Sequence, residues 1–281
     1  MAASSEPVAR NLNLYTYRRT NKAYVEDLGE GVKLRLMLIP SGEFVMGAPE
    51  SETESQDSER PQHRVEVRQF LMGCTPVTQA QWRVVAGYEL VESDLELNPS
   101  RFNGDNRPVE QVSWDEAQEF CRRLSLKSGK EYCLPSEAQW EYACRAGTET
   151  PFHFGETISF DSANYDSRYL YGVGSKVEYR GETTNVALLP ANDWGMYDMH
   201  GNVLEWCEDD WHVNYEGAPT DGSVWVDSSS YEAGKLLRGG SWYSFPGNCR
   251  SAYRNRHSRD DAFNGVGFRV CCVPPRILLS S

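Results

Sequence analysis

Apolar residues in the first part of the chain alternate with polar ones and then form a continuous run. Residues 32–39 read VKLRLMLI, a pattern that predicts a strand. A turn signal at 40–42 and a second apolar stretch at 43–47 extend this prediction to a hairpin. Residues 50–60 are predicted to form an acidic loop, and the charged and apolar alternation of residues 64–71 predicts another strand.

Three helices are predicted from the polar pairs at their starts. Each start matches a capping box, in which a Ser or Thr side chain and a Gln or Glu three residues later satisfy free backbone N–H groups. The pairs are Thr78 with Gln81, Ser113 with Glu116, and Ser136 with Gln139. An apolar face at i, i+3 and i+4 spacing follows the second start and indicates burial. Its residues are Trp114, Ala117, Phe120, Cys121 and Leu124.

Helical periodicity ends at Gly147, and the remaining chain is rich in Gly, Asn, Asp, Ser and Tyr. Such a long irregular stretch indicates either a loop-dominated functional face or elements that the pattern does not reveal. At the other end, residues 1–30 are polar and weakly patterned, and we interpret them as an N-terminal extension. The predicted domain covers residues 31–276, and residues 277–281 form a short tail.

The formal net charge is −13, which argues against a nucleic-acid partner because the phosphate backbone is itself anionic. The charge is unevenly distributed. Residues 181–234 contain eleven acidic residues and no Lys or Arg, whereas arginines dominate from residue 235 onward. The two segments either pair with each other inside the fold, or some of the acids hold a cation.

The first residues show no basic stretch followed by an apolar run, and no segment approaches the roughly 20 apolar residues that span a bilayer. We therefore expect a cytoplasmic protein without a membrane partner. In that reducing compartment the eight cysteines are predicted to be mostly buried thiols. The sequence contains no Cys-x-x-Cys pair, so the cysteine spacing does not indicate a structural metal site.

Six strings of the sequence together resemble the formylglycine-generating-enzyme (sulfatase-modifying factor) family. They are 39–47 (IPSGEFVMG), 108–114 (PVEQVSW), 134–143 (LPSEAQWEYA), 195–206 (GMYDMHGNVLEW), 238–242 (RGGSW) and 267–270 (GFRV). Their order matches that of the family, and they extend over residues 36–272. The resemblance implies an α+β, C-type-lectin-like fold with a small twisted antiparallel sheet, a few helices and much irregular structure.

The copper-dependent oxidases of this family use two cysteines shortly after the string at 238–242. Counting forward from that string, the first cysteine falls on Ser244 and the second on Cys249, whereas counting back from residues 267–269 places Cys249 elsewhere. A serine hydroxyl cannot replace a thiolate ligand of Cu(I). We therefore predict that the chain is not an enzyme and requires no cofactor. The alternative is an oxidase of a thiol or sulfatase peptide with Cys249 as its sole thiolate.

Residues 236–272 resemble the variable region of proteins that are diversified by retroelements. Randomising the adenines of Asn codons in such templates yields Tyr, Ser, Phe, His, Asp, Ala or Gly, but never Lys, Gln, Glu, Met or Trp. Ten residues obey this restriction and are the predicted ligand-binding positions: Tyr243, Ser244, Phe245, Gly247, His257, Ser258, Asp261, Ala262, Phe263 and Gly265.

Aromatic and small polar residues on loops are typical of binding surfaces, since they give contact area and adaptable hydrogen bonds at low entropy cost. We therefore predict a ligand-binding protein whose partner is another macromolecule, a protein. The alternative for Tyr243 and Phe245 is that they are core residues. Against that alternative, residues 243–247 (YSFPG) have the composition of a surface turn.

The family resemblance also implies a structural calcium ion near residues 201–206. The matching positions are Asp198, Gly201, Val203 and Glu205, of which the Gly and Val would contribute backbone carbonyls. Mixed oxygen ligands of this kind suit calcium. The alternative is a loop that is held by hydrogen bonds alone.

Overall fold

The computed structural model describes residues 20–172, 178–226 and 234–273. Residues 1–19 of the predicted extension and the predicted tail at 277–281 lie outside this part of the chain. The helices are α1 (Gln79–Ala86), α2 (Trp114–Ser128) and α3 (Glu137–Arg145), with short 3-10 helices η1 (Asp57–Glu59) and η2 (Pro246–Cys249). The strands are β1 (Ala23–Gly29), β2 (Val32–Ile39), β3 (Gly42–Met46), β4 (His63–Val67), β5 (Phe70–Gly73), β6 (Tyr132–Cys133), β7 (Leu204–Asp210), β8 (Lys235–Arg238), β9 (Asn255–His257), β10 (Val266–Gly267) and β11 (Cys271–Cys272).

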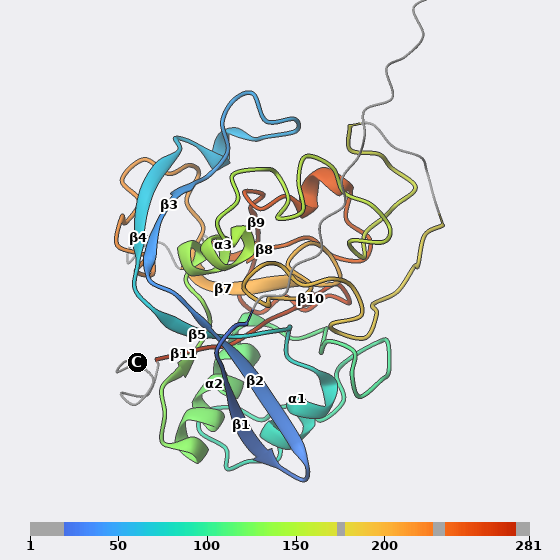
Figure 1. Ribbon diagram of the computed structural model, residues 1–281. Coiled ribbons are helices and arrows are strands. Elements are labelled where there is room, and N and C mark those ends of the chain that lie inside the picture. Colours follow the sequence, from blue (N-terminus) through green and yellow to red (C-terminus); the bar gives the residue numbers. More distant parts are fainter. Residues whose placement is uncertain (1–19, 173–177, 227–233, 274–281) are drawn as a thin grey trace, which may run out of the picture.

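The strands form three small sheets (Figure 1). One has the order β1-β2-β5-β11-β6, the second β10-β7-β8-β9, and the third pairs β3 with β4. All pairings are antiparallel except that of β10 with β7. Strand β11 lies between β5 and β6, so strands from both ends of the described chain share one sheet. The α+β class predicted for the domain is confirmed.

The structure differs from three predictions made from the sequence. Residues 23–29, placed in the extension, form the edge strand β1, whose exposed alternate positions explain its weak apolar pattern. The hairpin predicted over 32–47 does not form, because β2 pairs with β1 and β5 while β3 pairs with β4. The single strand predicted at 64–71 is divided into β4 and β5, which belong to different sheets.

All three predicted capping boxes are confirmed, because each involves residues only three positions apart. Helices α1 and α2 pack together, with α1 beside β1 and β2 and α2 beside β6, and α3 lies between the β3–β4 pair and strands β7 and β8 (Figure 1). In the core, the Trp82 and Phe120 rings of the first two helices stack, and the Phe268 ring meets both of them edge-on. Among the described residues, no helix is long and apolar enough to cross a bilayer.

Candidate functional site

Four buried arginines anchor residues 236–272, here called the variable segment, to the rest of the fold. The pairs are Arg238 with Glu137 and Glu141, Arg250 with Glu52 and Glu59, Arg254 with Glu137, and Arg269 with Glu205. Each guanidinium also donates to backbone carbonyls. Nε of Arg238 and of Arg250 has no hydrogen-bond partner among the described residues, whereas the terminal nitrogens of both side chains bind carboxylates and carbonyls. The loops between the arginines are therefore held at both ends.

These ion pairs show which acidic residues neutralise the arginine-rich end of the chain. Arg269 and Lys235 pair with Glu205 and Asp210, which lie in the acid-rich segment. The other three arginines use carboxylates from residues 52–141 instead. The expected pairing between the acidic and basic segments therefore accounts for part of the charge, and the first half of the chain supplies the remainder.

The structure places three aromatic residues of the variable segment at the surface. Tyr243, Phe245 and Phe263 are 41%, 50% and 40% exposed. Ser258 and Ala262 are also exposed, and His257 and Asp261 are half-buried. Tyr243 and Phe245 are therefore not core residues, although an aromatic pair in an otherwise buried segment would ordinarily favour the core.

The two loops that carry these residues are adjacent. The Trp242 ring lies edge-on to Tyr243 with centroids 4.9 Å apart, and its Nε1 donates to the carbonyl of Asn264 at 2.9 Å. On the second loop, the Phe263 and His257 rings lie 4.7 Å apart. We call Trp242, Tyr243, Phe245, His257 and Phe263 the aromatic face.

Three predicted binding positions are buried and face the protein. The Ser244 hydroxyl accepts a hydrogen bond from the backbone N–H of Ser241 at 2.9 Å, which closes the turn. A side chain at Gly247 would collide with Glu54, and one at Gly265 would collide with the Tyr243 ring. These residues shape the loops, so their prediction as contact residues is corrected.

Sequence reasoning missed three aromatic residues that border the aromatic face. Tyr169 contacts Phe245, and both Phe102 and Tyr179 contact Trp242. None of them lies in a periodic segment or a motif that we recognised. Their only signal in the sequence is that they are large aromatic residues in polar loops.

Neither residue of the expected thiol pair offers a reactive thiolate. The first position is Ser244, whose hydroxyl is used within its own turn. Cys249 is fully buried, and burial raises the pKa of its thiol well above the usual range. The eight cysteines are all free, in agreement with the prediction of unpaired thiols.

The cysteines differ in exposure, and this difference predicts the order in which a reagent modifies their thiols. N-ethylmaleimide near neutral pH is expected to modify Cys133 first, because Cys133 is exposed, and then the half-buried Cys74. Both reactions should be slow, because burial of the sulfur raises the pKa of both thiols. Cys249 is expected to react only after unfolding, since the reagent needs an accessible thiolate. Peptide mapping by mass spectrometry measures the order, with the urea-unfolded chain as the control. Modification of Cys249 in the folded protein would contradict this assignment.

The four residues matched to a calcium site are engaged in contacts within the chain. Both oxygens of Glu205 accept hydrogen bonds from Arg269, and Oε2 also accepts one from Trp140 Nε1. The Gly201 carbonyl accepts from Val203 N at 3.0 Å. Asp198 accepts from Ala187 N at 2.8 Å, and burial raises its pKa to about 6.

This arrangement does not fit a cation as it stands, because the Arg269 guanidinium already supplies the positive charge beside Glu205. Within the described residues, no group of three or more His, Cys, Asp or Glu side chains is placed to hold a metal ion. Calcium binding stays a prediction.

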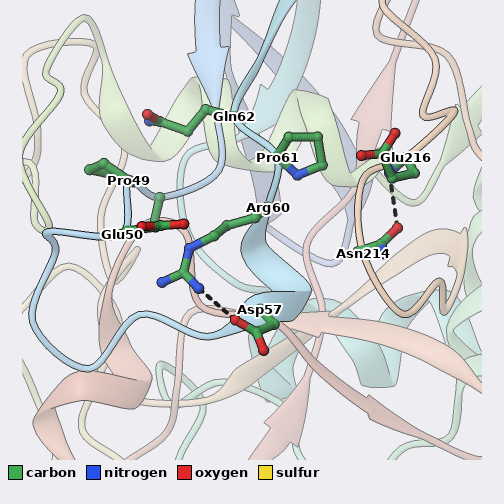
Figure 2. A pocket seen from close by; sticks show the side chains of 9 residues that line it. Pro49, Glu50, Asp57, Arg60, Pro61, Gln62, Asn214 and Glu216 are labelled. Atoms are coloured by element: carbon green, nitrogen blue, oxygen red, sulfur yellow. Dashed lines mark hydrogen bonds and ion pairs between the residues drawn. The ribbon is translucent and has the colours of Figure 1, made fainter.

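A separate open groove of about 540 Å³ lies beside the predicted acidic loop. Figure 2 shows the Arg60 guanidinium between Glu50 and Asp57, with a hydrogen bond to Asp57, and Glu216 on the opposite side. The described residues that line the groove include no His, Cys or Ser. Its charged groups are the carboxylates of Glu50, Asp57 and Glu216 and the guanidinium of Arg60, so it offers charge and shape without a thiol, a serine hydroxyl or an imidazole.

Most of the described chain corresponds to one protein family. Residues 30–273 match the sulfatase-modifying factor enzyme 1-like domain. The chain belongs to this family. Among its relatives is the serine/threonine-protein kinase pkn1 of Chlamydia caviae, which is 29% identical to this chain over 269 residues. That match covers 88% of this chain and 40% of the chlamydial protein, so the chain spans less than half of that relative.

Two solved structures share the fold of this family member over nearly its full length. PvdO from Pseudomonas aeruginosa has a TM-score of 0.75 and 31% identity, and the match covers 89% of this chain and 98% of PvdO. Treponema denticola variable protein 1 has a TM-score of 0.73 and 25% identity, covering 92% of this chain and 100% of that one. The C-type-lectin-like fold implied by the sequence motifs is confirmed.

Proposed function

We propose that this family member is a ligand-binding protein whose loops at 243–247 and 257–265 are diversified by a retroelement. The main support is that Tyr243, Phe245 and Phe263 are exposed on adjacent loops, and that buried arginines anchor the ends of these loops through ion pairs. Rigid support beneath exposed aromatic residues is what a changeable binding surface requires, because the fold tolerates replacement of the exposed residues.

The similarity to Treponema denticola variable protein 1 supports this function. The proposed partner is a protein. Aromatic side chains contribute large contact areas in protein interfaces, and the acidic chain disfavours nucleic acid. We also propose that the chain is not catalytic. Two observations support this: Cys249 is buried, and the Ser244 hydroxyl accepts a hydrogen bond within its own turn.

The proposal is tested by the genomic neighbourhood of the coding sequence. We expect a reverse transcriptase gene and a near-copy of the segment that encodes residues 236–272, with differences at adenines. The structure sharpens this expectation. Differences should fall at exposed positions such as 243, 245, 258, 262 and 263, and should spare the codons of the four anchoring arginines. A single-copy segment with no such gene nearby would contradict diversification.

A copper experiment tests the enzymatic alternative. The parent chain with Cys133→Ser, which removes the exposed thiol, is expected to bind no stoichiometric Cu(I) and to consume no oxygen with a cysteine-containing peptide. The matched variant adds Ser244→Cys and so supplies a second thiol near Cys249, which should increase Cu(I) affinity. Oxygen consumption with an aldehyde product in the parent chain would overturn the non-enzymatic assignment.

A further inference from the structure

The aromatic face continues beyond the variable segment onto a second, separate stretch of chain. The rings of Tyr169 and Phe245 meet edge-on with centroids 4.6 Å apart. Tyr169 is 47% exposed and its neighbour Leu170 is 40% exposed. The backbone N–H of Asp166 donates to the carbonyl of Ser244 at 3.0 Å, which ties this stretch to the first variable loop.

Trp242 joins the same face to two further aromatic residues. Its ring meets Phe102 edge-on at 5.3 Å and stacks with Tyr179 at 6.1 Å. Trp242 cannot arise from a randomised Asn codon, and it belongs to the motif at 238–242. The central ring of the face is therefore a fixed residue that contacts fixed neighbours.

Charges beside this surface are largely neutralised within the chain. Arg168 pairs with Asp166 at 2.7 Å, and Arg107 pairs with Glu182 at 3.1 Å. On the side of the second variable loop, the Arg259 guanidinium donates to Asp115. Arg101 is the exception, since it is exposed and its guanidinium lies 5.4 Å from the centroid of the Phe102 ring. The rest of the surface is apolar and internally charge-paired, although the chain as a whole carries a net charge of −13.

We propose that the binding surface is composite. Phe102, Tyr169, Leu170 and Tyr179, here called the fixed half, bind a feature that all ligands share, while the variable residues choose among those ligands. Since the fixed half is aromatic and aliphatic and most of its neighbouring charges are paired, its occupant is a protein segment that carries uncharged apolar side chains. This inference rests on the proposed function and adds the chemistry of the partner.

The test uses peptides selected from a phage-displayed random library on the full chain. Selected peptides are expected to be rich in apolar residues. Tyr169→Ala and Leu170→Ser should each weaken the binding of every selected peptide by roughly tenfold or more. Phe245→Ala should weaken the binding of only some of them. Leu126→Ala, at a 60% exposed position on α2, is the matched control and should change nothing.

The outcomes separate the two proposals. If Phe245→Ala weakens binding while both Tyr169→Ala and Leu170→Ser have no effect, the composite surface is wrong and the proposed function stands. If none of the three matters, or no peptide is enriched, both proposals fail. A steep loss of affinity between about 0.05 and 0.5 M salt would overturn the uncharged partner, because screening weakens only ionic contacts. Thermal unfolding of each variant confirms that it is folded.

Discussion

Replacing Arg250 with alanine is expected to lower the free energy of unfolding by about 3–5 kcal/mol. The Arg250 side chain is fully buried, and its guanidinium binds both oxygens of Glu59 at 2.7 and 2.8 Å and Glu52 Oε1 at 2.6 Å. Removing it leaves two carboxylates in the interior without their cation. The cost arises mainly from those uncompensated charges, rather than from the intrinsic strength of the ion pairs.

Urea unfolding of matched variants tests this account. Arg64→Ala removes one partner of the exposed pair with Glu43 and should cost under about 1 kcal/mol, because water solvates both groups. Adding Glu59→Gln to Arg250→Ala should recover part of the lost stability, since it removes one buried charge. If Arg250→Ala costs no more than Arg64→Ala, the arginines do not anchor the variable segment.

The second large effect is a dependence on pH at Glu110. This residue is fully buried, and its Oε1 accepts a hydrogen bond from Phe102 N at 2.8 Å. Its Oε2 has no hydrogen-bond partner among the described residues. Burial, the dominant cause, raises the pKa of this carboxyl to about 7 from an ordinary value of 4.5.

The folded state therefore holds the Glu110 proton more tightly than the unfolded state does. Folding is favoured by the neutral carboxyl at low pH, and this contribution is lost as the pH rises from about 4.5 to about 7. Glu110→Gln cannot ionise and escapes the loss. Its free energy of unfolding, relative to the parent, should increase by about 2–3 kcal/mol between pH 5 and pH 8.

Urea unfolding of both proteins at several pH values in this range measures the difference. A constant offset reports the altered packing of the amide, whereas only the slope with pH reports the ionisation of Glu110. Glu43→Gln, at an exposed position, is the matched control for the loss of a carboxylate. A difference that is independent of pH would show that Glu110 is already charged in the folded protein at low pH.

Local features of this protein could be predicted because they depend on neighbours in the sequence. The capping boxes that begin α1, α2 and α3 link residues three positions apart, and all three formed as expected. The ordered motifs likewise indicated the family and its fold, since each marks a local turn or helix start. The acidic and basic segments also suggested internal ion pairs, without indicating their partners.

The tertiary structure decided the features that join distant residues. It placed β1 at a sheet edge, separated β3 from β2, and paired Arg250 with carboxylates 191 and 198 positions away. It also left Tyr243 and Phe245 exposed while burying Ser244 between them. Sequence alone determined which segments could turn or coil. Exposure and pairing depend on which surfaces meet in three dimensions, and a linear pattern does not contain that information.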